Sequence, residues 1–208
     1  METCDAVIVG GGPAGSTCAW RLRQAGLQVT VLDKAVFPRD KVCAGWITPQ
    51  VVDELHIDPR EYREGRTFQA ITGFRVGVIG DDDVVEVSYG RPVSFGIRRC
   101  EFDDYLLRRS GARLLLGGPI SAIRQVTAGW NVNDCVTAPI LVGAGGHFCP
   151  VARMLTAWCG PYSVPVGRLT FQHRRAPSTS LMPICLAASL LGSTCTRTAY
   201  FVEPQTLT

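Results

Sequence analysis

A glycine-rich turn between two apolar runs constrains the fold of this chain more than any other feature. Residues 6–9 are continuously apolar, residues 10–15 read Gly-Gly-Gly-Pro-Ala-Gly, and a second apolar run at 29–32 ends in Asp33. Continuous apolar runs of this length are typical of parallel strands that are buried on both faces. Strand, glycine turn, helix, strand and acid follow one another in the order of a dinucleotide-binding βαβ unit.

Each glycine of the turn has a physical role in such a unit. Gly10 permits the tight turn out of the strand, Gly12 lets the backbone approach a pyrophosphate, and Gly15 lets the helix pack closely on the strand. The helix is predicted over 13–24, with its free N–H groups facing the phosphates. An acid at position 33 accepts hydrogen bonds from ribose hydroxyls and favours FAD or NAD over NADP. The candidate cofactor-binding residues here are Gly10, Gly11, Gly12, Pro13, Ala14, Gly15, Asp33 and Lys34.

Length, charge and cysteine content bound the class of protein. The 208 residues carry a net charge of +3, which is too small to indicate nucleic-acid binding. The nine cysteines form no C-x-x-C pair and show no metal-ligand spacing with the three histidines, so we expect free thiols, a reducing cytoplasm and no metal site. The first strand begins almost at Met1, so no signal segment is expected, and the apolar stretch 180–192 is too short to span a bilayer.

The segment that follows the second strand is predicted to be a loop, because a proline in it excludes a regular helix. Arg39 and Lys41 lie in this loop, close to a Cys43-Ala44-Gly45 turn. Either this turn lies against the flat ring of a cofactor, with the two cations near its phosphates or carbonyls, or the segment is a solvated surface loop with one buried cysteine. A short helix is predicted next, over 48–55.

A β-rich insert is predicted at about residues 67–95. The segments 68–78 and 84–89 partly alternate between apolar and polar residues, and three consecutive aspartates follow a glycine between them. The pattern predicts a hairpin. Because the aspartates lack the spacing of a calcium-binding loop, we expect them to be solvated.

A strand that leads into a helix is predicted over 95–107, with Phe102, Leu106 and Leu107 as its apolar stripe. Arg98 or Arg99, at the junction, can reach a phosphate or a cofactor ring, and a solvated arginine is the alternative for at least one of them. Further strands are predicted at 114–116, 119–126, 130–133 and 138–143.

Four sequence motifs occur between residues 4 and 154. They are Gly10-x-Gly12-x-x-Gly15, Phe37-Pro38-Arg39-x-Lys41-x-Cys43-Ala44-Gly45, Arg98-Arg99-x-x-Phe102-Asp103-x-x-Leu106, and Val142-Gly143-Ala144-Gly145-Gly146-His147-x-x-x-Val151-Ala152-Arg153. Together they resemble the N-terminal part of FAD-dependent oxidoreductases of the geranylgeranyl reductase type, within the larger group that includes the aromatic hydroxylases. The joint match is specific, although each motif alone is not.

The resemblance implies an α/β fold, a Rossmann-like FAD-binding domain with an inserted β-hairpin. It implies that FAD lies with its ADP half on residues 10–15 and Asp33, and with its flavin half near the Cys43-Ala44-Gly45 turn. It further implies one cofactor-facing arginine, Arg99 or Arg98.

Two backbone positions complete the candidate site. Ile120 matches a position of the family whose backbone touches the adenine. Gly143 ends a strand in a second glycine turn, whose N–H groups can approach the same cofactor.

The resemblance also implies a reaction class. Members of the family use reduced flavin on hydrophobic substrates, among them prenyl chains, or hydroxylate or oxidise other compounds. NAD(P)H or another external donor reduces the flavin, which carries the hydride chemistry, so no catalytic residue is assigned. A prenyl-lipid substrate implies peripheral membrane contact. The alternatives are a flavin monooxygenase, an inactive truncated fragment that keeps the ADP-binding half, and an NAD-dependent dehydrogenase, against which the second and third motifs argue.

Two departures from the family pattern concern the C-terminal part. The fourth motif has no acid in its glycine turn, and a later Gly-Asp motif is missing after Met154. From residue 155 on, lysine is absent and Glu203 is the one acid, so the net charge of +3 comes from this part. We therefore expect an incomplete FAD/NAD(P)-binding domain at 1–154 and a tail at 155–208 that is frameshifted or otherwise non-homologous. A genuine short variant with a divergent C-terminus is the alternative.

Overall fold

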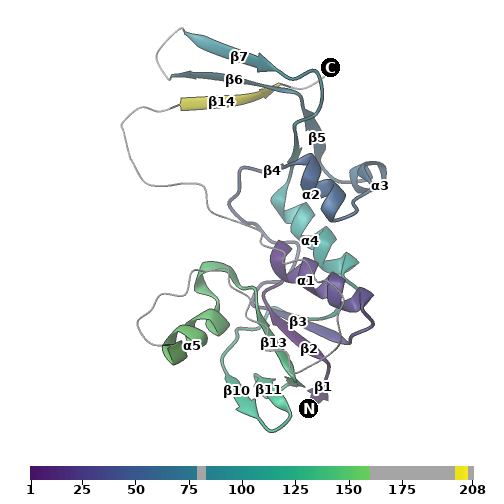
Figure 1. Cartoon of the computed structure of the whole chain (residues 1–208), viewed down its shortest axis with the longest axis vertical. Coiled ribbons are helices and arrows are strands. Elements are labelled where there is room, and N and C mark those ends of the chain that lie inside the picture. The colour runs from purple at the N-terminus through teal and green to yellow at the C-terminus, as the bar shows by residue number, and fades with distance from the viewer. Residues whose placement is uncertain (79–82, 160–199, 206–208) are drawn as a thin grey trace, which may run out of the picture.

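A four-stranded parallel sheet forms the centre of the N-terminal part of the chain. The computed structural model describes residues 1–78, 83–159 and 200–205. The strand order in the sheet is β13 (Ile140–Gly143), β2 (Ala6–Val9), β3 (Val29–Asp33) and β9 (Arg113–Leu116). The helix α1 (Pro13–Gln24) connects β2 to β3 and packs on the sheet (Figure 1). The predicted α/β fold class with a Rossmann-like unit is therefore confirmed.

The two faces of this sheet explain the continuous apolar runs. On one face Ile8 and Val31 pack with Ala19 of α1. On the other, Val7 and Leu32 pack against a small mixed sheet, in which one pair of strands is parallel and two pairs are antiparallel. Because successive residues of a strand point to opposite faces, a sheet covered on both sides buries every residue of β2. The second sheet has the order β1 (Glu2–Thr3), β12 (Val136–Ala138), β11 (Gly129–Val132) and β10 (Ile123–Val126).

An insert with its own core lies at the other end of the molecule, in the upper half of Figure 1. It contains α2 (Pro49–Glu54), α3 (Pro59–Arg63) and a three-stranded sheet in the order β4 (Trp46–Ile47), β8 (Ser94–Ile97), β5 (Phe68–Ile71). Tyr62, which is fully buried, packs edge-on against Phe68 and Tyr105 in this core. The helix α4 (Arg99–Arg109) carries the chain back to the parallel sheet.

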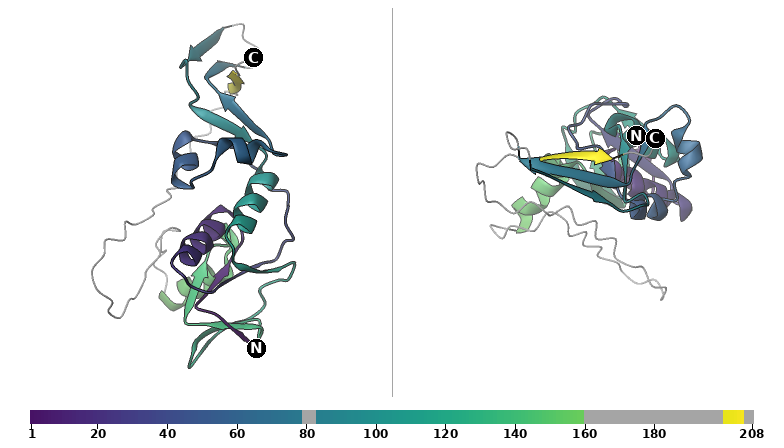
Figure 2. Two further views of the ribbon diagram at one scale, coloured as in Figure 1. Left: turned by 90° about the vertical axis from the view of Figure 1, so that its right-hand side faces the viewer. Right: turned by 90° about the horizontal axis from the view of Figure 1, so that it is seen from above.

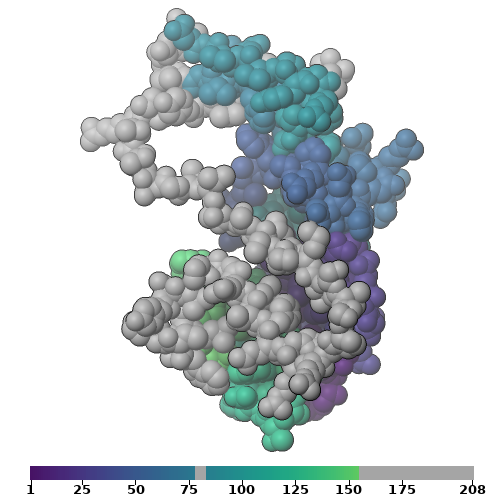
Figure 3. Space-filling view, in the orientation of Figure 1, coloured from purple at the N-terminus to yellow at the C-terminus, as the bar shows by residue number. Residues whose placement is uncertain are grey.

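The predicted hairpin of the insert is present as an outer sheet. Strands β6 (Gly73–Val78) and β7 (Val84–Ser88) pair antiparallel, and β14 (Tyr200–Gln205) pairs with the free edge of β6. Figure 2 shows this sheet stacked beyond the helices of the insert, and Figure 3 shows the same end of the molecule in space-filling form. Of the three consecutive aspartates in the hairpin turn, two lie outside the described residues.

The C-terminal part is described in two pieces. A single 3-10 turn, η1 (Gly146–Phe148), follows the glycine turn after β13 and leads into α5 (Pro150–Cys159), which runs across the expected boundary at residue 154. Most of the expected tail and the apolar stretch 180–192 lie outside the described residues, so the frameshift stays a prediction. Among the residues that the structure covers, no helix is both long and apolar enough to cross a bilayer.

Two predicted strands are shorter than expected, one because a polar side chain binds its backbone N–H groups and the other because a proline in it has no N–H. Residues 119–122 are not part of β10, since the Asn133 side chain accepts hydrogen bonds from the Ser121 and Ala122 N–H groups. The run 138–143 is divided at Pro139, which has no N–H, so β12 and β13 belong to different sheets.

Two further differences arise in the insert. The predicted strand 68–78 is divided at Thr72, where the chain changes its pairing partner from β8 to β7. The short helix α3 was not predicted, although Asp58 gives the signal: its carboxylate accepts a hydrogen bond from the Arg60 N–H at 2.7 Å, with Pro59 at the first helical position. The predicted helices 13–24 and 48–55 are confirmed as α1 and α2.

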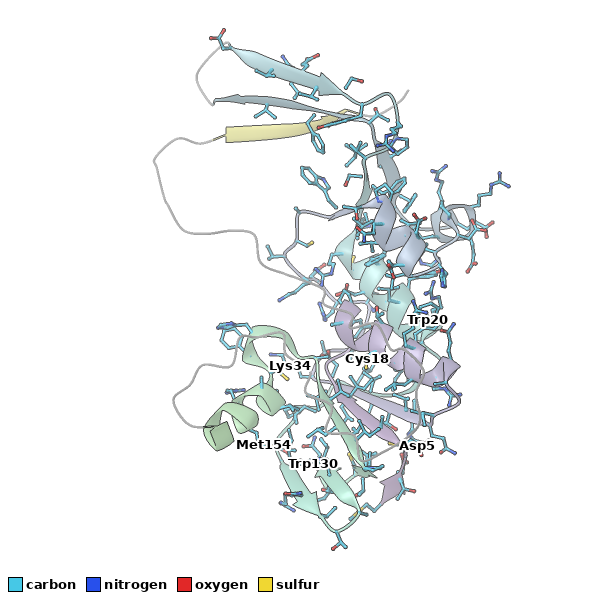
Figure 4. All side chains as sticks on the ribbon, in the orientation of Figure 1. Asp5, Cys18, Trp20, Lys34, Trp130 and Met154 are labelled. Atoms are coloured by element: carbon cyan, nitrogen blue, oxygen red, sulfur yellow. The ribbon has the colours of Figure 1, made fainter. Side chains whose placement is uncertain are left out.

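Two arginines join the insert to the Rossmann-like part. Arg109 of α4 donates to the carbonyls of Leu55 and His56, and Arg21 of α1 donates to the Glu54 carbonyl at 3.0 Å. Both guanidinium groups lie 4.5 Å from the ring centre of Trp20, which Figure 4 labels on α1. Cations at the C-terminal carbonyls of α2 are favoured by its helix dipole.

We expect Arg109→Ala to lower the free energy of unfolding by about 2 kcal/mol, because the two carbonyls lose a charged donor. Arg124→Ala is the matched control, since Arg124 forms an exposed pair with Asp134 on β10 and such pairs contribute less than about 1 kcal/mol. Urea unfolding followed by circular dichroism measures both. Equal losses in the two variants would contradict the stabilising role of Arg109.

Candidate dinucleotide-binding site

The glycine turn between β2 and α1 is held by two close backbone approaches. Gly10 has φ = +114°, and a Cβ there would lie 2.4 Å from the Ala144 backbone of the second glycine turn. A Cβ on Gly15 would lie 1.8 Å from the Gly10 carbonyl oxygen. No other residue type fits at either position, so these two glycines fix the path of the chain.

Gly12 differs from both, because its missing side chain leaves an open space. Among the described residues, the one heavy atom reported near a Cβ built there is Nη2 of Arg39, at 3.5 Å. The Ser16 N–H donates to the Gly12 carbonyl at 2.9 Å, and the N–H groups of Ala14 and Gly15 precede this first intrahelical hydrogen bond. The first turn of α1 carries no acidic residue. This helix end is therefore suited to an anion.

Asp33, at the end of β3, stabilises the glycine turn through hydrogen bonds. Its Oδ2 accepts a hydrogen bond from the Gly11 N–H at 2.7 Å, and its Oδ1 accepts one from the Ala35 N–H at 2.9 Å. Each carboxylate oxygen keeps a second acceptor site, which is free for a ribose hydroxyl. The contact with the ribose is still a prediction. Lys34, labelled in Figure 4, follows directly and is exposed.

Arg39 brings a cation to the open face of Gly12. Its Nη2 lies 3.2 Å from Oδ2 of Asp103, and its guanidinium lies over the Phe37 ring. Its Nη1 is buried and has no hydrogen-bond partner within the described part of the chain. A buried donor without a partner costs free energy, and a phosphate oxygen is the partner that guanidinium groups bind best. The residues around Gly12 therefore fit a bound pyrophosphate.

Arg99 and Cys43 form the other end of the same cluster. Arg99 Nε donates to Oδ1 of Asp103 at 2.5 Å. The Gly45 N–H lies 3.4 Å from the Cys43 sulfur; this contact, with the hydrogen bond and charge of Arg99, lowers the pKa of the exposed Cys43 thiol. Burial opposes the charge of Arg99, but hydrogen bonds to Asp103 and Cys43 outweigh it and raise its pKa.

Arg98 lies outside this cluster. Its side chain is 67% exposed and pairs with Glu101 at 3.2 Å. Of the two arginines left open by the sequence, Arg99 is thus the one that the structure brings toward the loop of Cys43.

The other residues that the sequence predicted to bind the cofactor either lie in the exposed loop or contact neighbouring parts of the protein. The Ala44 backbone lies in the exposed loop, and the Gly45 carbonyl accepts a hydrogen bond from the Ile97 N–H at 2.7 Å. Ile120 packs its side chain on the core between the two sheets. A Cβ on Gly143 would lie 2.8 Å from Val151, so the packing of α5 explains this glycine without a ligand.

The sequence analysis missed the central residue of the cluster. Asp103 is fully buried and bridges Arg39 and Arg99. A signal was available, since Asp103 lies three and four residues before Leu106 and Leu107 and therefore on the apolar stripe of α4. An acid on such a stripe requires a buried cationic partner.

The comparisons with known proteins agree with the N-terminal motifs. Residues 5–76 match the family DAO, described as FAD dependent oxidoreductase. A menaquinone reductase of Mycobacterium tuberculosis is 36% identical over 139 residues, which cover 60% of this chain and 31% of that protein. A geranylgeranyl diphosphate reductase of Rhodobacter capsulatus is 51% identical over 53 residues, or 26% of this chain and 13% of that protein. The chain thus spans about a third or less of the length of these two relatives.

Solved structures share the fold. A geranylgeranyl bacteriochlorophyll reductase-like protein from Thermoplasma acidophilum aligns over 68% of this chain and 38% of its own, with a TM-score of 0.57 and 22% identity. A mutant of the halogenase PltM in complex with FAD covers 73% of this chain and 36% of its own, with the same TM-score and identity. Sequence and fold together confirm the predicted resemblance: in its N-terminal part, this chain is similar to the FAD-dependent oxidoreductases of the geranylgeranyl reductase type.

Proposed function

We propose that this chain binds FAD and serves as the cofactor-binding part of a flavin-dependent oxidoreductase. The unpartnered Nη1 of Arg39, buried beside the open face of Gly12 and the N-terminus of α1, is the observation that carries this proposal. Two positive groups, a guanidinium and a helix N-terminus, meet there with space for an anion. The family match of residues 5–76 supports FAD as the dinucleotide.

Each part of the site has a separate task in this proposal. The α1 N-terminus and Arg39 bind the pyrophosphate, Asp33 accepts hydrogen bonds from the adenosine ribose, and the backbone of Ile120 borders the adenine. Arg99 and the Cys43-Ala44-Gly45 turn lie at the flavin half. When bound, FAD supplies hydride transfer, with NAD(P)H or another external donor as the source of electrons.

We further propose a hydrophobic, prenyl-bearing substrate. In β7, Val85 and Val87 are 65% and 40% exposed, and their partners across the hairpin are Val76 and Phe74. Trp46, at the end of the Cys43 loop, contacts Phe74 with a ring-centre distance of 5.5 Å. An exposed apolar face that continues to the loop at the flavin half supports an apolar ligand.

The names of several relatives favour the same substrate class. They include a menaquinone reductase, a geranylgeranyl diphosphate reductase and a digeranylgeranylglycerophospholipid reductase. Peripheral contact with a membrane follows if the substrate is a lipid. Six cysteines in the described part of the chain are free thiols, which supports a reducing, cytoplasmic environment.

Gly12→Ala tests the cofactor part of the proposal. The added methyl group meets no backbone atom within the described residues, so the apo fold tolerates it, but it occupies space that the pyrophosphate needs. We expect wild-type protein to bind FAD with near-stoichiometric flavin absorbance, and Gly12→Ala to bind it at least about tenfold more weakly with little change in melting temperature.

Gly118→Ala is the matched control, because a Cβ there enters open space, and we expect it to leave FAD binding unchanged. A colourless wild-type protein that stays folded would contradict the proposal and would favour a remnant that keeps only part of the site. Equal FAD affinity in all three proteins would also contradict it.

Val87→Glu tests the substrate part. We expect a charge on the apolar face to weaken the binding of a short-chain menaquinone by about tenfold, while FAD affinity stays unchanged. Val126→Glu is the control, because Val126 is also 40% exposed but lies on β10 in the other half of the molecule. Quenching of tryptophan fluorescence measures the binding. If Val87→Glu and Val126→Glu behave alike, the hairpin face is not the substrate surface.

A further inference from the structure

A buried carboxylate connects two segments of the candidate site. Asp103 of α4 has no exposed surface, yet it lies between Arg39, from the loop after β3, and Arg99, one helical turn earlier on α4. The cluster holds two cations and one anion, so it carries a net charge of +1. Burying a carboxylate is unfavourable unless cations compensate it, so Asp103 constrains both arginines to stay near it.

The contacts of Asp103 extend in both directions along the site. On one side, Oδ2 faces Nη2 of Arg39 at 3.2 Å, a charge contact without hydrogen-bond alignment. The same Nη2 lies at the open face of Gly12. On the other side, Oδ1 accepts from Nε of Arg99, whose positive charge helps to lower the pKa of the Cys43 thiol. One side chain thus links the surroundings of the glycine turn to those of the Cys43 loop.

Without Asp103, Arg39 keeps the Phe37 ring under its guanidinium and Arg99 keeps its interaction with the Cys43 thiol, but both lose their carboxylate partner. Arg39 lies in a loop whose residues 40–44 are all exposed, and Arg99 lies on the first turn of its helix. Long charged side chains at such positions lose conformational freedom when they bind a ligand, and this loss weakens binding. A partner that holds them before the ligand arrives removes part of that cost.

We propose that Asp103 is a positioning residue that holds Arg39 at the pyrophosphate half and Arg99 at the flavin half of the dinucleotide site, and so couples the two halves. This inference rests on the proposed binding of FAD. Asp103 itself touches neither half of the cofactor and acts through the two arginines.

A positioning role of Asp103 and a purely electrostatic role predict opposite changes in FAD affinity when its charge is removed. Asp103→Asn removes a negative charge beside a site for an anion, so charge alone predicts tighter FAD binding. A positioning role predicts weaker binding, by about tenfold, because both guanidinium groups lose their buried anchor. Asp104→Asn is the matched control, since Asp104 is the next residue of α4, pairs with Arg108 at an exposed position, and leaves the cluster intact.

A second measurement needs no cofactor. The tryptic peptide 42–60 contains Cys43 and no other cysteine, so mass spectrometry can follow its alkylation by iodoacetamide as a function of pH in the FAD-free full chain. If Arg99 stays in place, loss of the Asp103 charge lowers the alkylation midpoint further, because Asp103 raises the pKa of this thiol. If Arg99 moves away, the midpoint rises, because the thiolate loses the positive charge beside it.

We expect Asp103→Asn to weaken FAD binding and to raise the Cys43 midpoint, with both unchanged in Asp104→Asn. A lower midpoint, or FAD affinity that is unchanged or tighter, overturns the proposal. If wild-type protein binds no FAD but the midpoint still rises, the proposed function fails while the anchoring of Arg99 stands.

Arg99→Lys covers the case in which Asp103→Asn does not fold. Lysine keeps the charge beside Asp103 but cannot reach Asp103 and Cys43 together, so the same rise in midpoint is expected. A midpoint that stays at the wild-type value in Arg99→Lys also overturns the proposal.

Discussion

The close approach of α1 to β2 is the constraint on which the rest of this molecule depends. A Cβ at position 15 would overlap the Gly10 carbonyl at 1.8 Å, so the helix can lie against the strand only with glycine there. This approach directs the N-terminus of α1 across the end of the parallel sheet. Gly10 in turn packs against Ala144, which brings the second glycine turn to the same edge. The two turns and the helix end therefore converge at one place, as in dinucleotide-binding α/β units.

A second constraint is electrostatic. Asp103 is buried on the apolar stripe of α4, and its carboxylate draws Arg39 and Arg99 to it from two segments of the chain. Leaving such a charge without a partner costs about 3–5 kcal/mol. Once α4 has formed, the fold therefore strongly favours conformations in which the two arginines lie beside Asp103. The cluster leaves one positive charge in excess, and within it the buried donor Arg39 Nη1 and the buried acceptor Asp103 Oδ2 each lack a hydrogen bond. The excess charge and the unpaired donor match an anionic ligand, and neither contributes to the stability of the chain by itself.

Much of the fold follows from local sequence signals, and the site follows only in part. The apolar runs 6–9 and 29–32, Asp33 after the second run and the glycines between the runs are enough to predict the βαβ unit, because each of them follows a local rule of sequence. The strand predicted at 138–143 was wrong in extent, since Pro139 divides it between two sheets and no local pattern shows which sheet each half joins. The choice between Arg98 and Arg99 depends on the position of Asp103, a tertiary contact that spacing alone does not give.

Competition between nucleotides tests the central claim, that the site recognises the diphosphate of FAD at Gly12 and Arg39. FAD is bound to the full chain, and ADP or FMN is added while the released flavin is measured by fluorescence. We predict that ADP displaces FAD, because it carries the adenosine and diphosphate groups for which the α1 N-terminus and Arg39 are arranged. FMN, with a single phosphate and no adenosine, should displace FAD far less. Displacement by FMN but not by ADP would contradict the claim, because recognition would then lie in the flavin half.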